Sequence, residues 1–281
     1  MPLIVTAQLY SGRMNPTWVV PDDRFADLAA RFSFEEGGPA NAPSRLGYRG
    51  LRVRHTDPEL NAAPMMSRNA ASTPSAGALI AAEPELESAL VATHGEVLSE
   101  AALSHILQRI EDVGDGGDRT APTPKVTCPT NHGQGAPAYD PSVWNSDAYI
   151  QDNNNCYNYA NNQITNNFAQ PGYATGQVWN AYTCSNVSAA ATRDGLVAVG
   201  DVSATIPGWY VALVIWPNED YHWYRQDDTG CWSHKTGEDP ATNLDNANKQ
   251  ISDPQTCDRG DYTTWCTYMK TDKSVKIAGP R

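Results

Sequence analysis

The spacing of apolar and polar positions predicts strands alternating with helices in the N-terminal half of the chain. Apolar residues run from Leu3 to Leu9, and residues 50–55 alternate apolar and basic side chains, as in a strand with one wet face. Helical spacing is found in three segments, at residues 22–32, 84–93 and 99–113. Residues 58–78 are rich in Ala, Pro, Ser and Asn, and we expect a loop there.

A break in this pattern separates the chain into two parts. From Gly114 the sequence is rich in Gly and Asp and leads into Pro122 and Pro124, which favours neither helix nor strand. A chain of 281 residues has room for two ordinary domains. We therefore predict three parts: a smaller α/β N-terminal domain at 1–113, a linker at 114–127 and a second domain at 128–281.

The second part begins with a polar helix and continues as β-structure. Residues 152–160 have a short polar helical pattern, which we expect to continue until Pro171 and Gly172 stop it. Strand patterns follow at residues 209–216, 221–225 and 230–235. A hairpin turn at residues 227–230 would join the last two. A helix followed by an antiparallel sheet makes the predicted fold class α+β.

Charge and hydropathy narrow the classes of partner. The net charge is −12 and the pI is near 4.8, which argues against a grip on nucleic-acid phosphates. No apolar stretch reaches the roughly 18 residues of a membrane-spanning helix, and the first residues lack the basic start and the length of a signal peptide. We expect neither nucleic acid nor membrane as a partner, and a cytoplasmic protein by default, with non-classical export left open.

Six cysteines lie in the second part, at positions 128, 156, 184, 231, 257 and 266. Without a visible leader, we expect reduced thiols. If Cys156 is a free nucleophile, at least one further cysteine stays unpaired in any disulfide scheme. Two alternatives stay open: a local disulfide between Cys257 and Cys266, and a zinc site at Cys231 and His234 completed by those two cysteines.

The polar helix carries the residue types of a thiol catalyst. Cys156 stands among Asn and Asp residues near the predicted start of the helix, where the helix dipole and a nearby imidazole would stabilise a thiolate. His222 and His234 follow on two neighbouring predicted strands. This order of residues predicts a cysteine and two histidines that act together.

The same order resembles the papain-like superfamily of cysteine peptidases and amidases, especially its NlpC-type and CHAP-type branches. Cys156, followed by Tyr159 and Ala160, is similar to the Cys-x-x-Tyr-small pattern at the CHAP nucleophile, and a second histidine one hairpin after the first is typical of NlpC-type enzymes. The resemblance covers residues 140–240, although the Asp-Cys-Ser-Gly motif of the NlpC branch is absent. It implies a papain-like C-terminal domain in which a nucleophile helix packs on an antiparallel sheet.

This resemblance implies a role for each candidate residue. Cys156 would attack the carbonyl of a peptide or another amide, and His222 would take its proton and pass it to the leaving group. His234 would orient His222. The function predicted is a cysteine-dependent hydrolase without cofactor or catalytic metal. A thiol-dependent acyltransferase or deamidase differs only in the acceptor and stays an alternative.

Side-chain amides and a carboxylate complete the candidate site. Asn154 or Asn155 would supply the second oxyanion donor beside the backbone N–H of the cysteine. Asp227 and Asn243 are substitutes if His234 is not the orienting residue.

A competing interpretation is a non-enzymatic module that binds a ligand or a protein, with structural Cys and His residues. Seven of the eight tryptophans follow the linker, and an aromatic β face would hold such a ligand.

Residues 10–18 and 46–50 contain Gly, Pro and aromatic residues typical of ordered turns, and we hypothesise a targeting or regulatory role for the N-terminal part. Asn186-Val187-Ser188 is an acceptor sequence for N-glycosylation, which carries little weight without a leader.

Overall fold

The computed structural model describes residues 3–32, 34–36, 45–55, 65–67, 79–81, 84–114 and 126–280. Over these residues helices combine with two largely antiparallel sheets, neither of which closes into a barrel. The predicted α+β class is therefore confirmed. Contacts divide the chain into two compact units, which we describe separately. Unit 1 comprises Met1–Leu9, Asn15–Ala42 and Tyr48–Ala121, and unit 2 comprises Tyr10–Met14, Pro43–Gly47 and Pro122–Arg281.

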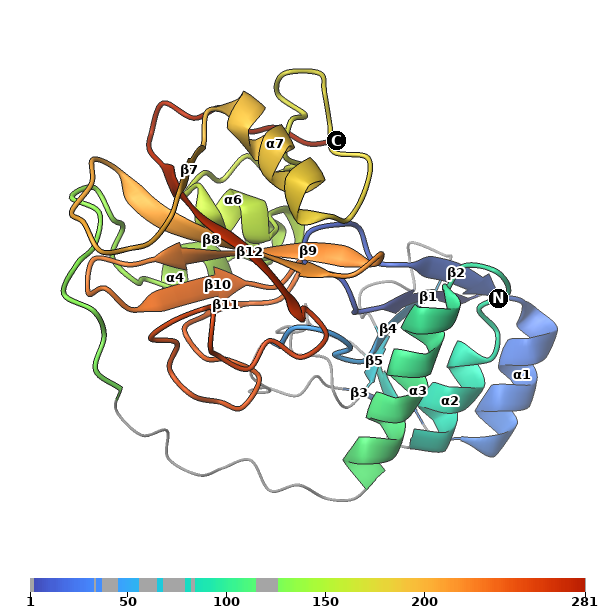
Figure 1. The fold of residues 1–281 in the computed structure, drawn as a ribbon. Helices are drawn as coiled ribbons and strands as arrows, with labels where there is room; N and C mark the ends of the chain where they lie inside the picture. Colours follow the sequence, from blue (N-terminus) through green and yellow to red (C-terminus); the bar gives the residue numbers. More distant parts are fainter. Residues whose placement is uncertain are drawn as a thin grey trace. The chain divides into compact units, whose positions relative to one another are not determined.

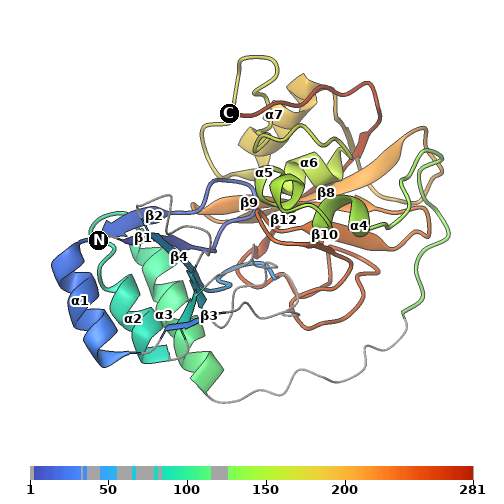
Figure 2. The ribbon, with the colours of Figure 1, turned by 180° about the vertical axis from the view of Figure 1, so that it is seen from behind.

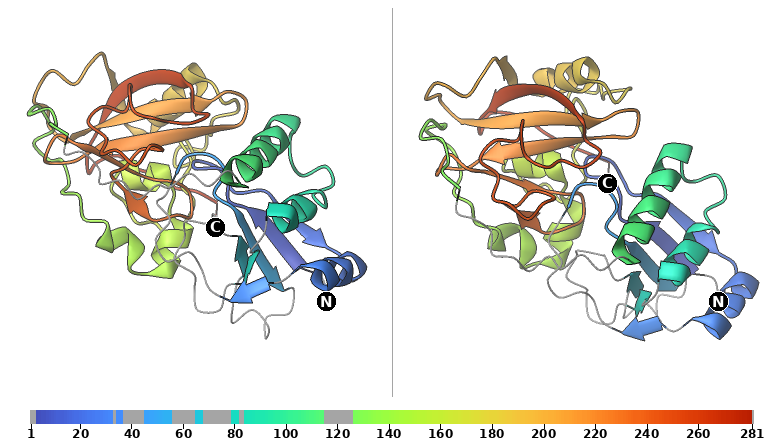
Figure 3. Two further views of the ribbon diagram at one scale, coloured as in Figure 1. Left: turned by 90° about the horizontal axis from the view of Figure 1, so that it is seen from below. Right: turned by 60° about the horizontal axis from the view of Figure 1, so that its bottom comes forward.

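In its described residues, unit 1 contains a six-stranded sheet and three helices. Its strands are β1 (Leu3–Ala7), β2 (Thr17–Val20), β3 (Phe34–Glu36), β4 (Leu51–His55), β5 (Met65–Ser67) and β6 (Leu79–Ala81). In the order β2-β1-β4-β5-β6-β3, all neighbours are antiparallel except β5 and β6. Its helices are α1 (Asp22–Arg31), α2 (Pro84–Val91) and α3 (Glu100–Gly114). Helices α2 and α3 lie side by side over one face of the sheet (Figures 2 and 3).

The sequence pattern anticipates most elements of unit 1. The hydroxyl of Ser99 accepts a hydrogen bond from the backbone of Ala102 at 3.1 Å, as expected of an N-cap. Two details differ. Strand β5 lies inside the segment predicted to be a loop, of which the remainder lies outside the described residues. Arg52, predicted to face water, is only 5% exposed. Residues 115–125 of the predicted linker also lie outside the described part of the chain.

Unit 2 is built on a six-stranded antiparallel sheet. Its strands are β7 (Val197–Val199), β8 (Trp209–Trp216), β9 (Asp220–Gln226), β10 (Trp232–Lys235), β11 (Ala241–Thr242) and β12 (Thr264–Thr271). The order is β11-β10-β9-β8-β12-β7 (Figure 1). The three predicted strands correspond to β8, β9 and β10, joined by the predicted hairpin. Strands β7 and β12 have no counterpart in the sequence prediction.

Four helices belong to unit 2. They are α4 (Ser142–Asn145), α5 (Ala148–Asn153), α6 (Cys156–Ala160) and α7 (Cys184–Asp194). Seen from behind, α4, α5 and α6 lie in front of the sheet (Figure 2). Helix α6 ends well before the predicted stop at Pro171, because the chain turns at Asn162, which adopts a left-handed conformation with φ of 50°. Asparagine is among the few residues that tolerate this conformation.

The core of unit 2 lies between the sheet and helices α6 and α7. Alternate residues of β8 and β9 face these helices, as the period of two in a strand requires. The cluster includes Trp209, Val211, Leu213 and Ile215 of β8, Tyr221 and Trp223 of β9, Cys156 and Tyr157 of α6, and Val187 and Ala191 of α7. This packing places the start of α6 directly against β9.

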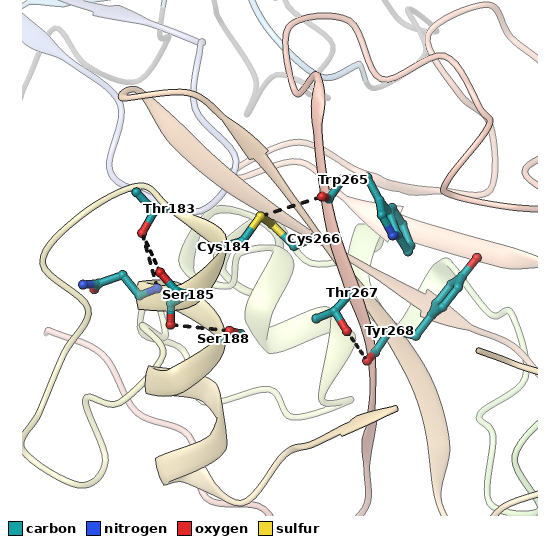
Figure 4. The surroundings of a disulfide bond; sticks show 9 residues. Thr183, Cys184, Ser185, Ser188, Trp265, Cys266, Thr267 and Tyr268 are labelled. Carbon is teal, nitrogen blue, oxygen red and sulfur yellow. Dashed lines mark hydrogen bonds between the residues drawn. A yellow bond between two sulfur atoms is a disulfide. The ribbon is translucent and has the colours of Figure 1, made fainter. Parts of the chain in front are cut away.

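Two disulfides cross-link unit 2. Cys184 at the start of α7 pairs with Cys266 on β12 (Figure 4), and Cys128 pairs with Cys231. The free cysteines are Cys156, which is buried, and Cys257. The prediction of reduced thiols is therefore wrong, as is the alternative pairing of Cys257 with Cys266. Because disulfides persist in oxidising compartments, they indicate a secreted or extracellular protein and correct the cytoplasmic expectation.

Among the described residues, no helix combines the length and the apolar character that crossing a membrane requires.

Candidate functional site

The start of helix α6 is held by an asparagine cap. Asn155 accepts hydrogen bonds from the backbone of Tyr157 at 3.0 Å and of Asn158 at 3.2 Å, and Asn158 returns a bond to the backbone of Asn155 at 3.1 Å. This capping box satisfies donors that a helix start leaves open. It places Cys156 at the first position of the helix, as the sequence predicts.

The thiol of Cys156 is enclosed by protein. The residue is 0% exposed, and this burial, together with the nearby carboxylate of Asp220, raises the pKa of Cys156 to about 12. Desolvation disfavours a thiolate more than the short helix stabilises it. From the sequence we expect a lowered pKa for Cys156, because the helix dipole and an imidazole both favour the thiolate. Burial, which raises the pKa, is not visible in the sequence.

His222 lies on the other side of β9 from helix α6. Tyr221 and Trp223 belong to the same core cluster as Cys156, and successive strand residues point to opposite faces. The ring of His222 therefore packs against the rings of Tyr224 and His234, at centroid distances of 4.6 Å and 4.9 Å. The predicted pair of histidines is in contact, but on the face away from the helix.

Ser11 links the thiol to the histidines. Its hydroxyl hydrogen-bonds the thiol of Cys156 and lies 2.5 Å from Nδ1 of His222. Nε2 of His222 lies 2.9 Å from Nδ1 of His234, and Nε2 of His234 lies 2.9 Å from the carbonyl oxygen of Leu244. The result is a continuous hydrogen-bonded row of five residues in the interior of unit 2.

The direction of each bond in this row follows from its last acceptor. The carbonyl of Leu244 can only accept, so Nε2 of His234 donates to it. In a neutral ring the other nitrogen accepts, which makes His222 the donor to His234 and Ser11 the donor to His222. The lone pair on Nδ1 of His222 therefore faces the hydroxyl of Ser11.

Burial keeps His234 neutral. His234 is 1% exposed, and its enclosure lowers the pKa of His234 to about 4. A charged imidazolium, which would stabilise a thiolate, is thus disfavoured at neutral pH. The thiol therefore has a raised pKa and His234 a lowered one, both because the groups are buried.

The segment Tyr10–Met14 is held against β9 by backbone and side-chain contacts, and we call it the clasp. The carboxylate of Asp220 accepts from the backbone of Ser11 at 2.6 Å, of Gly12 at 3.1 Å and of Arg13 at 3.2 Å. The hydroxyl of Tyr262 donates to the same carboxylate at 2.6 Å. Four donors on one buried carboxylate fix the clasp beside the thiol.

The carbonyl of Gly12 makes a second set of clasp contacts. It accepts from Asn155 at 2.9 Å, Gln170 at 2.8 Å and the hydroxyl of Tyr221 at 3.0 Å. A Cβ atom at Gly12 would come within 2.5 Å of the Tyr221 ring. Only glycine therefore fits at this position without displacement of the ring.

A buried lysine supports the loop that leads into α6. Lys235 is 0% exposed, and its ammonium group donates to the backbone carbonyls of Gln151, Asn154 and Gly237 at 2.5 to 2.6 Å. Burial lowers the pKa of Lys235 to about 8. Two of these carbonyls belong to the segment that leads into α6 and the third to the loop after β10, so the lysine ties the two segments together.

The remaining predicted residues have structural contacts. The amide of Asn154 donates to Ile150 and Asn166, and the amide of Asn155 donates to Ala169 and Gly12, so both are engaged within the fold. Asp227 pairs with Arg225 at 2.8 Å and accepts from Ser233 at 2.9 Å. Asn243 accepts from the backbone of Ile251 through its own carbonyl.

The zinc alternative loses its ligands to the disulfides. Cys231 is bonded to Cys128 and Cys266 to Cys184, so His234 and Cys257 remain of the proposed set. Within the described residues, no cluster of three or more Cys, His, Asp or Glu is arranged to hold a metal ion.

Sequence reasoning did not find three residues of the network. Ser11, Asp220 and Lys235 come from segments distant in the chain, and only packing brings them to α6. The turn around Ser11 was conspicuous for its Gly, Pro and aromatic content, but nothing in the sequence relates it to Cys156.

Comparison with known proteins identifies one kind of relative. No family model matches the chain, and no solved structure matches it. Insoluble matrix shell protein 1 of Ruditapes philippinarum is 45% identical over 139 residues, which are 50% of this chain and 93% of that protein. The prediction of a papain-like cysteine hydrolase is therefore wrong, because the relative is a shell matrix protein and not a peptidase. With nearly the whole relative aligned at this identity, the chain belongs to the family of insoluble matrix shell protein 1.

Proposed function

We propose that this protein is a non-enzymatic structural component of an extracellular matrix, and that Cys156, His222 and His234 maintain its fold. The observation that carries the proposal is the enclosed thiol. Cys156 is 0% exposed with a pKa raised to about 12 by burial, and the nearby imidazoles are engaged with each other and with Ser11. A group that is neither accessible nor ionised serves packing and hydrogen bonding.

The relative supports the matrix part of this proposal. Its name describes a protein of the insoluble shell matrix, and the shared region amounts to half of the present chain. Two disulfides fit a protein that must persist outside the cell, since each one restrains a long loop of the unfolded chain.

A second candidate function, also non-enzymatic, is a ligand-binding module. Fewer aromatic side chains are available to a ligand than the sequence implied. Five of the tryptophans in unit 2 are buried core residues: Trp144, Trp209, Trp216, Trp223 and Trp232. Trp179 and Tyr182 are half-buried, with ring centroids 4.6 Å apart, and Arg13 lies over the Tyr182 ring at 5.4 Å. This cluster is where an aromatic-binding ligand would meet unit 2.

Fractionation of the source tissue tests the matrix role. An antibody against the full chain should detect it in the extracellular fraction that resists extraction by salt and detergent. Detection in the cytosol alone would contradict the proposal.

Thiol labelling tests the structural role of Cys156. Native full-length protein should show no labelling of Cys156 by iodoacetamide between about pH 5 and pH 8, and full labelling after denaturation. Cys257, which is free and less enclosed, is the internal comparison. Rapid labelling of Cys156 near pH 6 that disappears in the His222→Ala variant would refute the structural assignment.

A further inference from the structure

The first turn of helix α7 contains an acceptor sequence for glycosylation that the matrix function does not use. Asn186-Val187-Ser188 satisfies the rule Asn-x-Ser/Thr with x other than proline. Elsewhere in the chain the spacing Asn-x-Ser/Thr occurs only at Asn15-Pro16-Thr17, which the rule excludes because x is proline. The two disulfides indicate an oxidising compartment, in which such an acceptor sequence can be modified.

We propose that Asn186 carries an N-linked oligosaccharide. The Cys184–Cys266 disulfide begins two residues before it, so this segment passes through an oxidising compartment, where such acceptor sequences are also modified. The proposal goes beyond the matrix function and does not depend on it, because a matrix protein without a glycan would still be a matrix protein.

The folded structure has room for the sugar. Beside Asn186 is an open hollow of about 310 Å³, a size at the lower end of ligand-binding clefts. It is lined by Val178, Asn180, Ser185, Asn186, Ala189 and Arg193. Figure 4 shows Cys184 reaching from α7 toward β12, whereas Val187 is the residue of the acceptor sequence that enters the core. The asparagine and the serine therefore lie on the outer part of the helix.

The contacts of Asn186 are compatible with the modification. Its side-chain oxygen accepts from the backbone of Asn180 at 2.8 Å, and its Nδ2 donates to the side chain of Asn180 at 2.7 Å, both at exposed positions. That bond needs one of the two Nδ2 hydrogens, so the other is available for substitution. The hydroxyl of Ser188 donates to the carbonyl of Ser185 at 3.5 Å, which is a weak contact, and the carbonyl of Ser188 accepts from Thr192 at 2.9 Å.

The covalent step is a transfer from a lipid-linked oligosaccharyl diphosphate, catalysed by the transferase of the secretory pathway. The bond between Nδ2 of Asn186 and C1 of the first sugar forms as the bond between C1 and the diphosphate oxygen breaks. Nδ2 loses one proton, and the lipid diphosphate leaves. No oxidant or reductant is needed.

The experiment is expression of the full chain behind a secretory leader in animal cells, followed by peptide-N-glycosidase F and peptide mapping. We expect the enzyme to lower the apparent mass of the protein on a gel by one step and to convert Asn186 to Asp, while Asn15 stays unmodified. Ser188→Ala should abolish the step, and Ser188→Thr should retain it. The two Ser188 variants keep Asn186 in place. The test therefore does not depend on an Asn186→Gln variant, which could fail to fold.

Two results would overturn the proposal. One is secreted wild-type protein with unmodified Asn186 and no mobility change. The other is a mobility step that persists in Ser188→Ala, which would place the glycan elsewhere. Either would leave the matrix proposal standing, because that rests on the buried network and on the relative.

Discussion

Several buried polar residues in unit 2 are hydrogen-bonded within the protein. Cys156, His234 and Lys235 are each at most 1% exposed, and each has partners inside the protein. Burial without such partners would cost several kcal/mol for each group. The residues that resemble a catalytic set are therefore better understood as an internal polar network, which ties α6 and the clasp to the sheet.

His234 should make the fold sensitive to acid. A folded pKa of about 4 against an ordinary value of 6.5 means that the unfolded chain binds a proton first, so stability present above pH 6.5 is lost as pH falls toward 4. The shift corresponds to about 3 kcal/mol. Urea unfolding from pH 7 to 4 should show this loss, and His234→Gln should reduce its slope.

Other titratable groups also contribute to the pH dependence of stability, so the His234→Gln variant must be compared with the wild type at each pH. Asp245 acts electrostatically on His234, and burial raises the pKa of Asp220, which changes stability in the opposite direction. If wild type and His234→Gln share the same pH slope, His234 is not the group responsible.

Lys235 should be essential to the turn that precedes α6. Lys235→Met keeps most of the side-chain volume but removes the donor to three buried carbonyls, and we expect a loss of about 3 kcal/mol or more in the free energy of unfolding. Lys273→Met, at an exposed position, is the matched control and should change stability by less than about 0.5 kcal/mol. Equal effects of the two substitutions would contradict the role of Lys235.

At the scale of elements, the clasp and strand β9 depend on each other. Residues 220–223 of β9 extend beyond the part of the strand that pairs with β10, and the clasp contacts this extension through Asp220 and Tyr221. The clasp comes from the N-terminal end of the chain but belongs to unit 2 by its contacts. Unit 2 is therefore incomplete without residues that precede the predicted linker.

Gly12→Ala tests the fit of the clasp. The added Cβ would meet the ring and the backbone of Tyr221 at 2.5 to 2.7 Å, so either the clasp or the strand must move. Overpacking of this kind costs about 1–3 kcal/mol. Gly200→Ala is the control, because nothing lies within 4 Å of its Cβ position. Chemical denaturation of both variants should separate them, and equal midpoints would argue against a tight clasp.

At the scale of the whole molecule, long-range cross-links dominate the organisation of unit 2. The two disulfides join residues 103 and 82 positions apart, and one of them fastens α7 to β12. Such long loops lose much conformational entropy when closed, which stabilises the folded state relative to the unfolded chain. This is consistent with a protein that persists outside the cell.

Removal of the cross-link between α7 and β12 should be costly. We expect the double variant Cys184→Ser, Cys266→Ser to lose about 2–4 kcal/mol of stability, measured by thermal and denaturant unfolding. Cys257→Ser, which removes a free thiol, should lose less. A double variant as stable as the wild type would mean that the disulfide adds nothing to the fold.

Local sequence patterns alone determined most elements near the site, including β8, β9, β10, the hairpin and the placement of Cys156 at a helix start. These depend on neighbouring residues through periodicity, capping and turn chemistry. The sequence also placed the two histidines on adjacent strands.

Only the tertiary structure shows the burial and the distant partners on which the reactivity of those residues depends. Ionisation depends on burial and on distant partners, and here enclosure raises the pKa of Cys156, while Ser11 and Asp220 arrive from segments that local patterns cannot relate. The disulfide pairing was equally inaccessible, because spacing does not specify which cysteines meet. A pattern of residue types states which chemistry could occur, and the solvent and contacts around each residue determine whether it does.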